Sequence, residues 1–235
     1  MAITQVGTVQ AGNATNGADV TLTFDGSPAE DDLVLLVGGT GDLDAAGDIG
    51  PVESGYTQRA LFRGPGGSPP FSGGVWTKPL GASPDASVTG QGSGNAAEGT
   101  AYASVVLRGV DLANPLDIAI VETGPTTGAD ADLDGGTIVT DGAWVFLYVV
   151  TSGNIGSFSS SPSGYTTEAV QEGVDTVRAH LILSSKADLA PGAEDPGAYD
   201  WQSSTTWYGF FIAIRPETLD EFPTQVIPVR YIGRV

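Results

Sequence analysis

The chain has no cysteine, and it has only one histidine and one methionine among its 235 residues. Without cysteine, neither a disulfide nor a thiolate metal site can hold the fold, and a cysteine nucleophile is excluded. No G-x-S-x-G motif marks a serine nucleophile, so nothing pairs with His180 as a catalytic base. We therefore expect a protein that is not an enzyme, with His180 exposed on a strand. A glycosidase-like pair of carboxylates stays open as a third hypothesis, because the sequence singles out no two of them.

Basic residues are also scarce. Nine Lys and Arg stand against 28 Asp and Glu, which gives a formal net charge of −19. Such a surface repels phosphate backbones and anionic lipid, so we expect neither nucleic acid nor a membrane as partner. The start of the chain lacks the basic and apolar regions of a signal peptide. The longest apolar run, residues 143–150, is too short to span a bilayer. We expect synthesis in a cytoplasm.

Helical periodicity is missing along the whole chain. Glycine and proline, 34 and 15 residues, separate short segments that alternate with period two or are continuously apolar. These segments are typical of strands. They cover residues 20–24, 33–37, 102–107, 116–121, 143–150, 177–183 and 207–214. We expect Gly38–Gly41 to form a strand-ending turn, since the third glycine of a dinucleotide loop is missing. Only residues 185–190 suggest a helical turn.

An internal duplication of about a hundred residues is the most informative pattern. Ser54-Gly55-Tyr56-Thr57 recurs as Ser163-Gly164-Tyr165-Thr166. At nearly the same spacing, further residues of one half match the other: Ala60 and Leu61 with Ala169 and Val170, Asp32 with Asp141, Lys78 and Leu80 with Lys186 and Leu189, and Tyr102 and Arg108 with Tyr208 and Arg215. The sequence predicts an all-β fold, a jelly-roll-like antiparallel β-sandwich over residues 1–216. Its repeats span about 18–111 and about 137–216, and two tandem sandwiches remain the alternative.

One acidic segment resembles the front of a calcium loop. Asp130, Asp132 and Asp134 alternate before Gly135, and Asp141 follows at the twelfth position. Oxygen ligands at this spacing suit calcium, although aspartate replaces the usual glutamate and no helices flank the loop. The alternative is a solvated acidic turn, in which case the protein needs no cofactor. A second acidic group, Asp42, Asp44 and Asp48, lacks that spacing.

Two tryptophans and two arginines are the remaining candidates for binding. Trp76 and Trp201 fall in polar sequence, where they could stack on sugar rings or seal a loop against the sandwich. Arg230 and Arg234 lie in the C-terminal segment 217–235, which has no counterpart in the first repeat. In an acidic protein the two arginines near the end of this segment suit an interface arm.

The repeated unit resembles one found in virion proteins of tailed bacteriophages and phage-like particles. Their pattern is an acidic turn, an apolar strand, a P-S-G-[WY]-T loop, a strand with a lysine, and an apolar-aromatic strand ending near arginine. Here it reads Asp31–Leu35, Glu53–Thr57 and Pro162–Thr166, Lys186, and Val105–Asp111. Both copies of the loop have tyrosine where tryptophan is usual. The resemblance covers residues 29–217 and implies a virion component such as a head decoration, spike or tail accessory protein, without catalytic residues.

Our leading hypothesis from the sequence is therefore a non-enzymatic virion structural protein. It would be made in the host cytoplasm, form a homo-oligomer and contact other capsid or tail proteins. The alternative is a carbohydrate-binding module or receptor-binding adhesin that grips a glycan with loop aromatics, with or without calcium.

Overall fold

The computed structural model describes residues 2–41, 49–64, 71–173 and 175–218. These residues form strands and connecting turns, and none of them lies in a helix that could cross a membrane. The first half contains β1 (Thr4–Ala14), β2 (Val20–Thr23), β3 (Leu33–Gly41), β4 (Thr57–Arg63), β5 (Phe71–Pro79), β6 (Ser87–Gly90) and β7 (Glu98–Arg108). The second contains β8 (Val121–Leu133), β9 (Gly136–Ile138), β10 (Ala143–Ser152), β11 (Phe158–Ser160), β12 (Thr166–Glu172), β13 (Val177–Leu189), β14 (Gly192–Glu194) and β15 (Gly197–Ile214).

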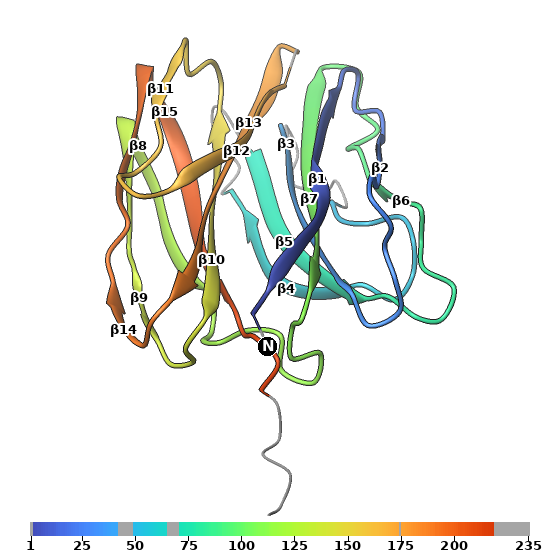
Figure 1. Ribbon diagram of the computed structural model, residues 1–235. Helices are drawn as coiled ribbons and strands as arrows, with labels where there is room; N and C mark the ends of the chain where they lie inside the picture. Colours follow the sequence, from blue (N-terminus) through green and yellow to red (C-terminus); the bar gives the residue numbers. More distant parts are fainter. Residues whose placement is uncertain (1, 42–48, 65–70, 174, 219–235) are drawn as a thin grey trace, which may run out of the picture.

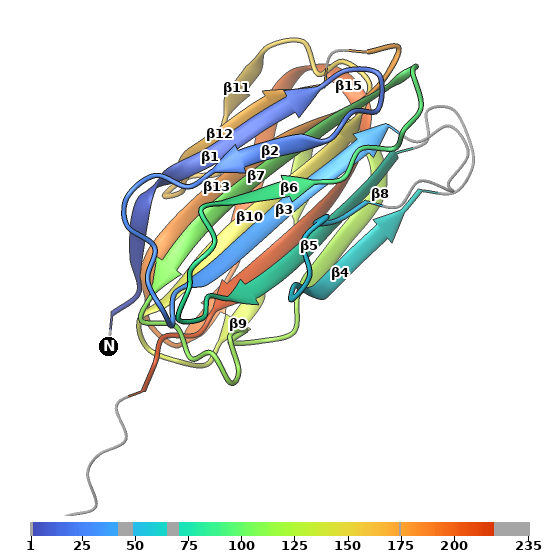
Figure 2. The ribbon, with the colours of Figure 1, turned by 90° about the vertical axis from the view of Figure 1, so that its right-hand side faces the viewer.

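The predicted all-β, sandwich-like fold is confirmed. One main sheet has the order β4-β5-β3-β7-β1 and the other has the order β12-β13-β10-β15-β8. Figure 2 shows the first of these sheets with its strands side by side. A short parallel pairing of β13 with β7 joins the two sheets, through Val177 with Glu98 and Arg178 with Gly99. All other pairings between the described strands are antiparallel.

The two halves share one strand order. β4, β5, β3, β7 and β1 of the first correspond to β12, β13, β10, β15 and β8 of the second, and the small pair β2–β6 corresponds to β9–β14. Even a register shift recurs, between Gln58 and Ala60 in β4 and between Thr167 and Ala169 in β12. By strand order the halves begin with β1 and β8, earlier than the predicted repeats. A common origin of the halves remains a prediction from the sequence.

The apolar core explains why the sheets pack face to face (Figure 1). Leu33, Leu35 and Val37 alternate along β3 and point inward, where they meet Phe146 and Tyr148 of β10. This central cluster draws on both halves, so the halves share one core instead of forming two independent sandwiches. Three further clusters fill the outer faces. One lies beneath β2 and β6, a small one contains Val34, Leu80 and Val106, and one lies beneath β8, β9 and the first part of β15. Both main sheets are therefore covered on both sides.

The predicted turn at Gly38–Gly41 is wrong, because these residues continue β3. A Cβ atom at Gly38 would overlap the ring of Tyr102, and so would one at Gly90. Glycine is needed here so that the strands can accept a large ring, not so that the chain can turn. The tyrosine hydroxyl accepts the N–H of Gly50 at 3.0 Å and donates to the carbonyl of Gln91 at 2.9 Å.

Two other local predictions are also wrong. Residues 185–190 form no helical turn, since β13 continues to Leu189. The hydroxyl of Ser185 donates to the carboxylate of Glu168 on the neighbouring strand β12. Residues 116–121 form no strand: Leu116 makes an isolated bridge to Ile214, and β8 begins only at Val121. The side chain of Asp117 accepts the backbone N–H groups of Val139 and Thr140, and this ties the loop to the chain that follows β9.

Candidate functional site

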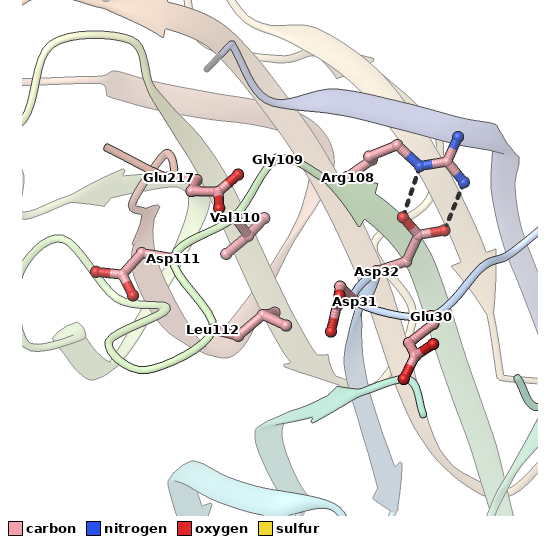
Figure 3. A pocket seen from close by; sticks show the side chains of 9 residues that line it. All are labelled: Glu30, Asp31, Asp32, Arg108, Gly109, Val110, Asp111, Leu112 and Glu217. Atoms are coloured by element: carbon pink, nitrogen blue, oxygen red, sulfur yellow. Dashed lines mark hydrogen bonds and ion pairs between the residues drawn. The ribbon is translucent and has the colours of Figure 1, made fainter. Parts of the chain in front are cut away.

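A pocket opens at the end of the sandwich where both described chain ends lie. Its volume is about 460 Å³, and it is lined by Glu30, Asp31, Asp32, Arg108, Gly109, Val110, Asp111, Leu112 and Glu217. Figure 3 shows Asp111 and Glu217 on one side and Glu30 and Asp31 on the other, with Val110 and Leu112 between them. The turn before β3 supplies one wall and the chain leaving β7 supplies the other.

An ion pair fixes one wall of this pocket. Arg108 donates from Nε and from Nη2 to the two carboxylate oxygens of Asp32, both at 2.8 Å, and Asp32 is only 1 % exposed. The hydrogen bonds that Arg108 donates to Asp32, together with the negative charge of that carboxylate, raise the pKa of Arg108 above its ordinary value. Because this guanidinium is already paired, the remaining carboxylates leave the pocket negative. The lining suits a cation or a basic segment and contains no nucleophile with a neighbouring base.

The second half has a related but not identical anchor. Asp117 is buried and accepts the N–H groups of Val139 at 2.6 Å and Thr140 at 3.1 Å. Arg215 Nε lies 3.5 Å from its carboxylate. Burial raises the pKa of Asp117, but the hydrogen bonds from Thr140 and Val139, with the charge of Arg215, outweigh burial and hold it below its ordinary value. The sequence match of Asp32 with Asp141 therefore does not extend to the contacts, since Arg215 takes Asp117 as its partner.

The repeated S-G-Y-T motif builds two matching clusters, which we call the first and second clamp. In the first clamp, Lys78 Nζ lies 5.3 Å from the ring centre of Tyr56 and 2.7 Å from Asp85. In the second, Lys186 Nζ lies 5.4 Å from the ring centre of Tyr165 and 2.7 Å from Glu194. Each lysine therefore combines a cation–π contact with an ion pair.

The glycine of each motif turns the chain into its clamp. Gly55 and Gly164 have φ angles of 91° and 84°, a region that other residues rarely adopt. Burial raises the pKa of Tyr56, and the charges of Asp85 and Glu53 add to this effect. Burial also raises the pKa of Tyr165, and the hydrogen bond that Tyr165 donates to Glu194 raises it further. The motif thus serves packing in both halves.

The predicted calcium ligands are not brought together. Asp130 and Asp132 lie on the extended strand β8, Asp134 follows it, and Asp141 precedes β10. Alternate residues of a strand are about 7 Å apart, whereas a calcium loop curls its ligands around one point. Within the described parts of the chain, no three acidic or histidine side chains are placed to hold a metal ion. Asp130 instead lies directly across from Asp200 of β15.

The proposed sugar-binding role of the two tryptophans is corrected by their burial. Trp76 lies in β5 and is 3 % exposed, and Trp201 lies in β15 and is 4 % exposed. Trp201 donates from Nε1 to the carbonyl of Gly128 at 3.2 Å. Neither ring presents a face to a ligand, because each fills an outer apolar cluster. Both tryptophans instead fit the alternative given above, in which the ring packs into the sandwich.

Of three other predicted features, the structure contradicts one, and two lie outside the described residues. His180 is not exposed: its exposed fraction is 0 %, because the face opposite the central core is also covered. Arg230 and Arg234 lie outside the described residues, and so do Asp42, Asp44 and Asp48. The sequence analysis predicts neither the acidic pocket nor the contacts of Asp117, and the signal for both is the position of carboxylates beside strand ends.

Comparisons with family models, curated proteins and solved structures found no match to this chain. Its function must therefore be argued from its own residues.

Proposed function

We propose that this chain is a non-enzymatic structural protein of a phage-like particle. It decorates or stabilises the capsid, or forms part of a spike or tail, through contacts between subunits. The observation that carries this proposal is the pair of clamps. The motif that resembles virion proteins, S-G-Y-T followed by a lysine strand, is built twice at equivalent places, and both times it fastens a loop to the sheet. A scaffold needs such fastening, whereas a catalytic site would need the side chains to face a substrate.

The placement of the chain ends supports attachment to a neighbour. Glu217 N–H donates to the carbonyl of Gly109 at 2.8 Å, and Gly109 lies next to Ala2. Both ends of the described chain therefore leave from the same end of the sandwich, beside the acidic pocket (Figure 1). The segment that continues from there carries Arg230 and Arg234 on a protein of net charge −19. We assign this segment as an arm that docks on an acidic neighbouring subunit, either another copy or a second virion protein.

The glycan-binding alternative has no comparable support. It depended on Trp76 and Trp201, and both rings are buried.

The test is to locate the protein in particles. Antibodies against the purified chain would be used for immunogold labelling and for quantification in particles sedimented from the source organism. We expect a fixed stoichiometry and label at regular positions on the particle surface. Protein found only in the soluble fraction would contradict the proposal.

The arm is tested with a chain that ends at Thr218 and with two charge variants of the full chain. Arg230→Glu with Arg234→Glu reverses the charge, and Arg230→Lys with Arg234→Lys is the matched control that keeps it. We expect the truncated and reversed chains to fold but to be lost from particles, with the lysine pair retained. If particles incorporate the charge-reversed chain at the normal level, these arginines do not hold the arm on its neighbour.

A further inference from the structure

Two strands have an outer edge on one side of the sandwich, which we call the β4–β8 side. Among the described strands, β4 pairs only with β5, and β8 pairs only with β15. On the opposite side the edges cover each other, since Asn13 of β1 donates to the carbonyl of Glu172 of β12 at 2.8 Å. Figure 2 shows β4 and β1 along opposite margins of the first main sheet. An outer strand edge is a surface on which another chain can pair.

The two edge strands of this side carry opposite charge. β4 contains Arg59 and Arg63 and no carboxylate. β8 contains Glu122, Asp130 and Asp132 and no basic residue. A basic edge and an acidic edge therefore border the same side of one molecule. This arrangement favours a second copy that is turned so that unlike edges meet.

Arg59 is a partly buried charge without a carboxylate beside it. Its Nε donates to Oγ1 of Thr77 at 2.7 Å, and none of the ion pairs between described residues includes it. Burial lowers the pKa of Arg59 below its ordinary value. Charged groups that lose water are usually paired, so this guanidinium indicates an anionic partner from another molecule.

Glu122 is the carboxylate of β8 that lies at the height of Arg59 along the strands. Phe62 of β4 stacks on Tyr208 of β15, and the Tyr208 hydroxyl donates to Oε2 of Glu122 at 2.7 Å. Glu122 pairs with Phe210, two residues further along β15 than Tyr208. Arg59 precedes Phe62 on β4, and the successive pairings make β4 run opposite to β15. Arg59 and Glu122 are therefore displaced from the aromatic stack towards the same end of the sandwich.

We propose that two copies of the chain form a dimer through their β4–β8 sides, in which Arg59 of each copy pairs with Glu122 of the other. A two-fold axis parallel to the strands places β4 of each copy against β8 of the other, so the same contact forms twice. This axis keeps heights along the strands unchanged, and Arg59 therefore faces Glu122. A two-fold axis across the strands would instead bring β4 against β4 and β8 against β8, where like charges repel. The proposal does not depend on the virion role, because it concerns the purified chain.

Analytical ultracentrifugation of the purified full chain tests the dimer and its charges. We expect a monomer–dimer equilibrium in which Arg59→Glu and Glu122→Arg each raise the Kd of the dimer at least about 100-fold, because each change breaks two pairs. Arg178→Glu is the matched control, since it reverses another partly buried arginine, on β13, away from this side. It should leave the Kd unchanged. A natural chain that is monomeric at every concentration would overturn the proposal.

Mixing the two charge variants decides whether these residues face each other. In a mixed dimer, one seam has the natural pair and the other has the reversed pair, so the mixture should dimerise although each variant alone does not. Circular dichroism checks that the variants fold, and Arg59→Gln or Glu122→Gln replaces one that does not and should also weaken the dimer. A mixture that stays monomeric would overturn the pairing. A dimer strengthened by Arg59→Glu would overturn it too, because like edges would then be meeting.

Discussion

Two fully buried tyrosines offer a direct test of the polar contacts in this fold. Tyr102 and Tyr148 are each 0 % exposed and lie in the two main sheets. The hydroxyl of Tyr102 makes two hydrogen bonds, with the N–H of Gly50 and with the carbonyl of Gln91. The hydroxyl of Tyr148 has no partner in the protein. The perturbation is the same in both cases, replacement by phenylalanine.

The expected effects have opposite signs. Tyr102→Phe leaves a backbone donor and a backbone acceptor without their partner, and we expect it to lower the free energy of unfolding by about 2 kcal/mol. Tyr148→Phe removes a buried hydroxyl that gains nothing from the fold. We expect it to leave stability unchanged or to raise it by about 1 kcal/mol.

Urea unfolding followed by circular dichroism and by tryptophan fluorescence measures both changes. Coincident transitions would show that unfolding is two-state, and an unchanged slope lets the midpoint report stability. For a chain of this size, the loss in Tyr102→Phe corresponds to a melting temperature lower by about 4–8 °C. If Tyr148→Phe loses as much stability as Tyr102→Phe, the reasoning from hydrogen-bond partners is wrong.

Three further predictions concern the clamps and two carboxylate sites. Lys78→Met and Lys186→Met should each destabilise by at most about 1 kcal/mol and to a similar extent in urea unfolding, because the clamps match; clearly unequal losses would refute their equivalence. Asp130→Asn should raise stability by about 0.2–1 kcal/mol by removing repulsion from Asp200, and a rise in the wild-type melting temperature on adding calcium would show instead that a cation binds there. Asp117→Asn should cost about 2 kcal/mol at pH 7, and this cost should shrink in melts below pH 4, since the ionised carboxylate stabilises the fold only above its lowered pKa.

Apolar alternation predicted the strands well, because the central core selects one face of each strand. Leu33, Leu35 and Val37 alternate in the sequence and lie together between the sheets. The duplicated tyrosine and lysine were also visible, although their contact was not. Sequence spacing matched Tyr102 with Tyr208 as equivalent positions of the two repeats. In the structure Tyr102 pairs with Gly38 and Tyr208 with Val150, and the two rings lie in different clusters. A shift of one residue moves a side chain to the other face of a sheet.

The failures at His180, Trp76 and Trp201 share one physical cause. Reading His180 as exposed and Trp76 and Trp201 as available assumed that each sheet has one face in water. The structure covers the outer faces as well, with β2 and β6 on one side and β8, β9 and part of β15 on the other. Period-two patterns identify two faces but not what covers each one. Residues on the face opposite the central core were therefore expected in water, although that face is covered.

Equal strand order in the two halves does not give equal packing at the two sides of the sandwich. On one side β1 lies against β12, and the contacts there are polar: Asn13 bonds the Glu172 carbonyl, close to the paired strands β7 and β13. On the other side Phe62 of β4 stacks on Tyr208 of β15, with ring centres 3.9 Å apart. The stacked rings bury apolar surface and exclude water, whereas hydrogen bonds between strands hold the side of β1 and β12. One strand order is therefore closed by different kinds of contact at the two sides of the sandwich.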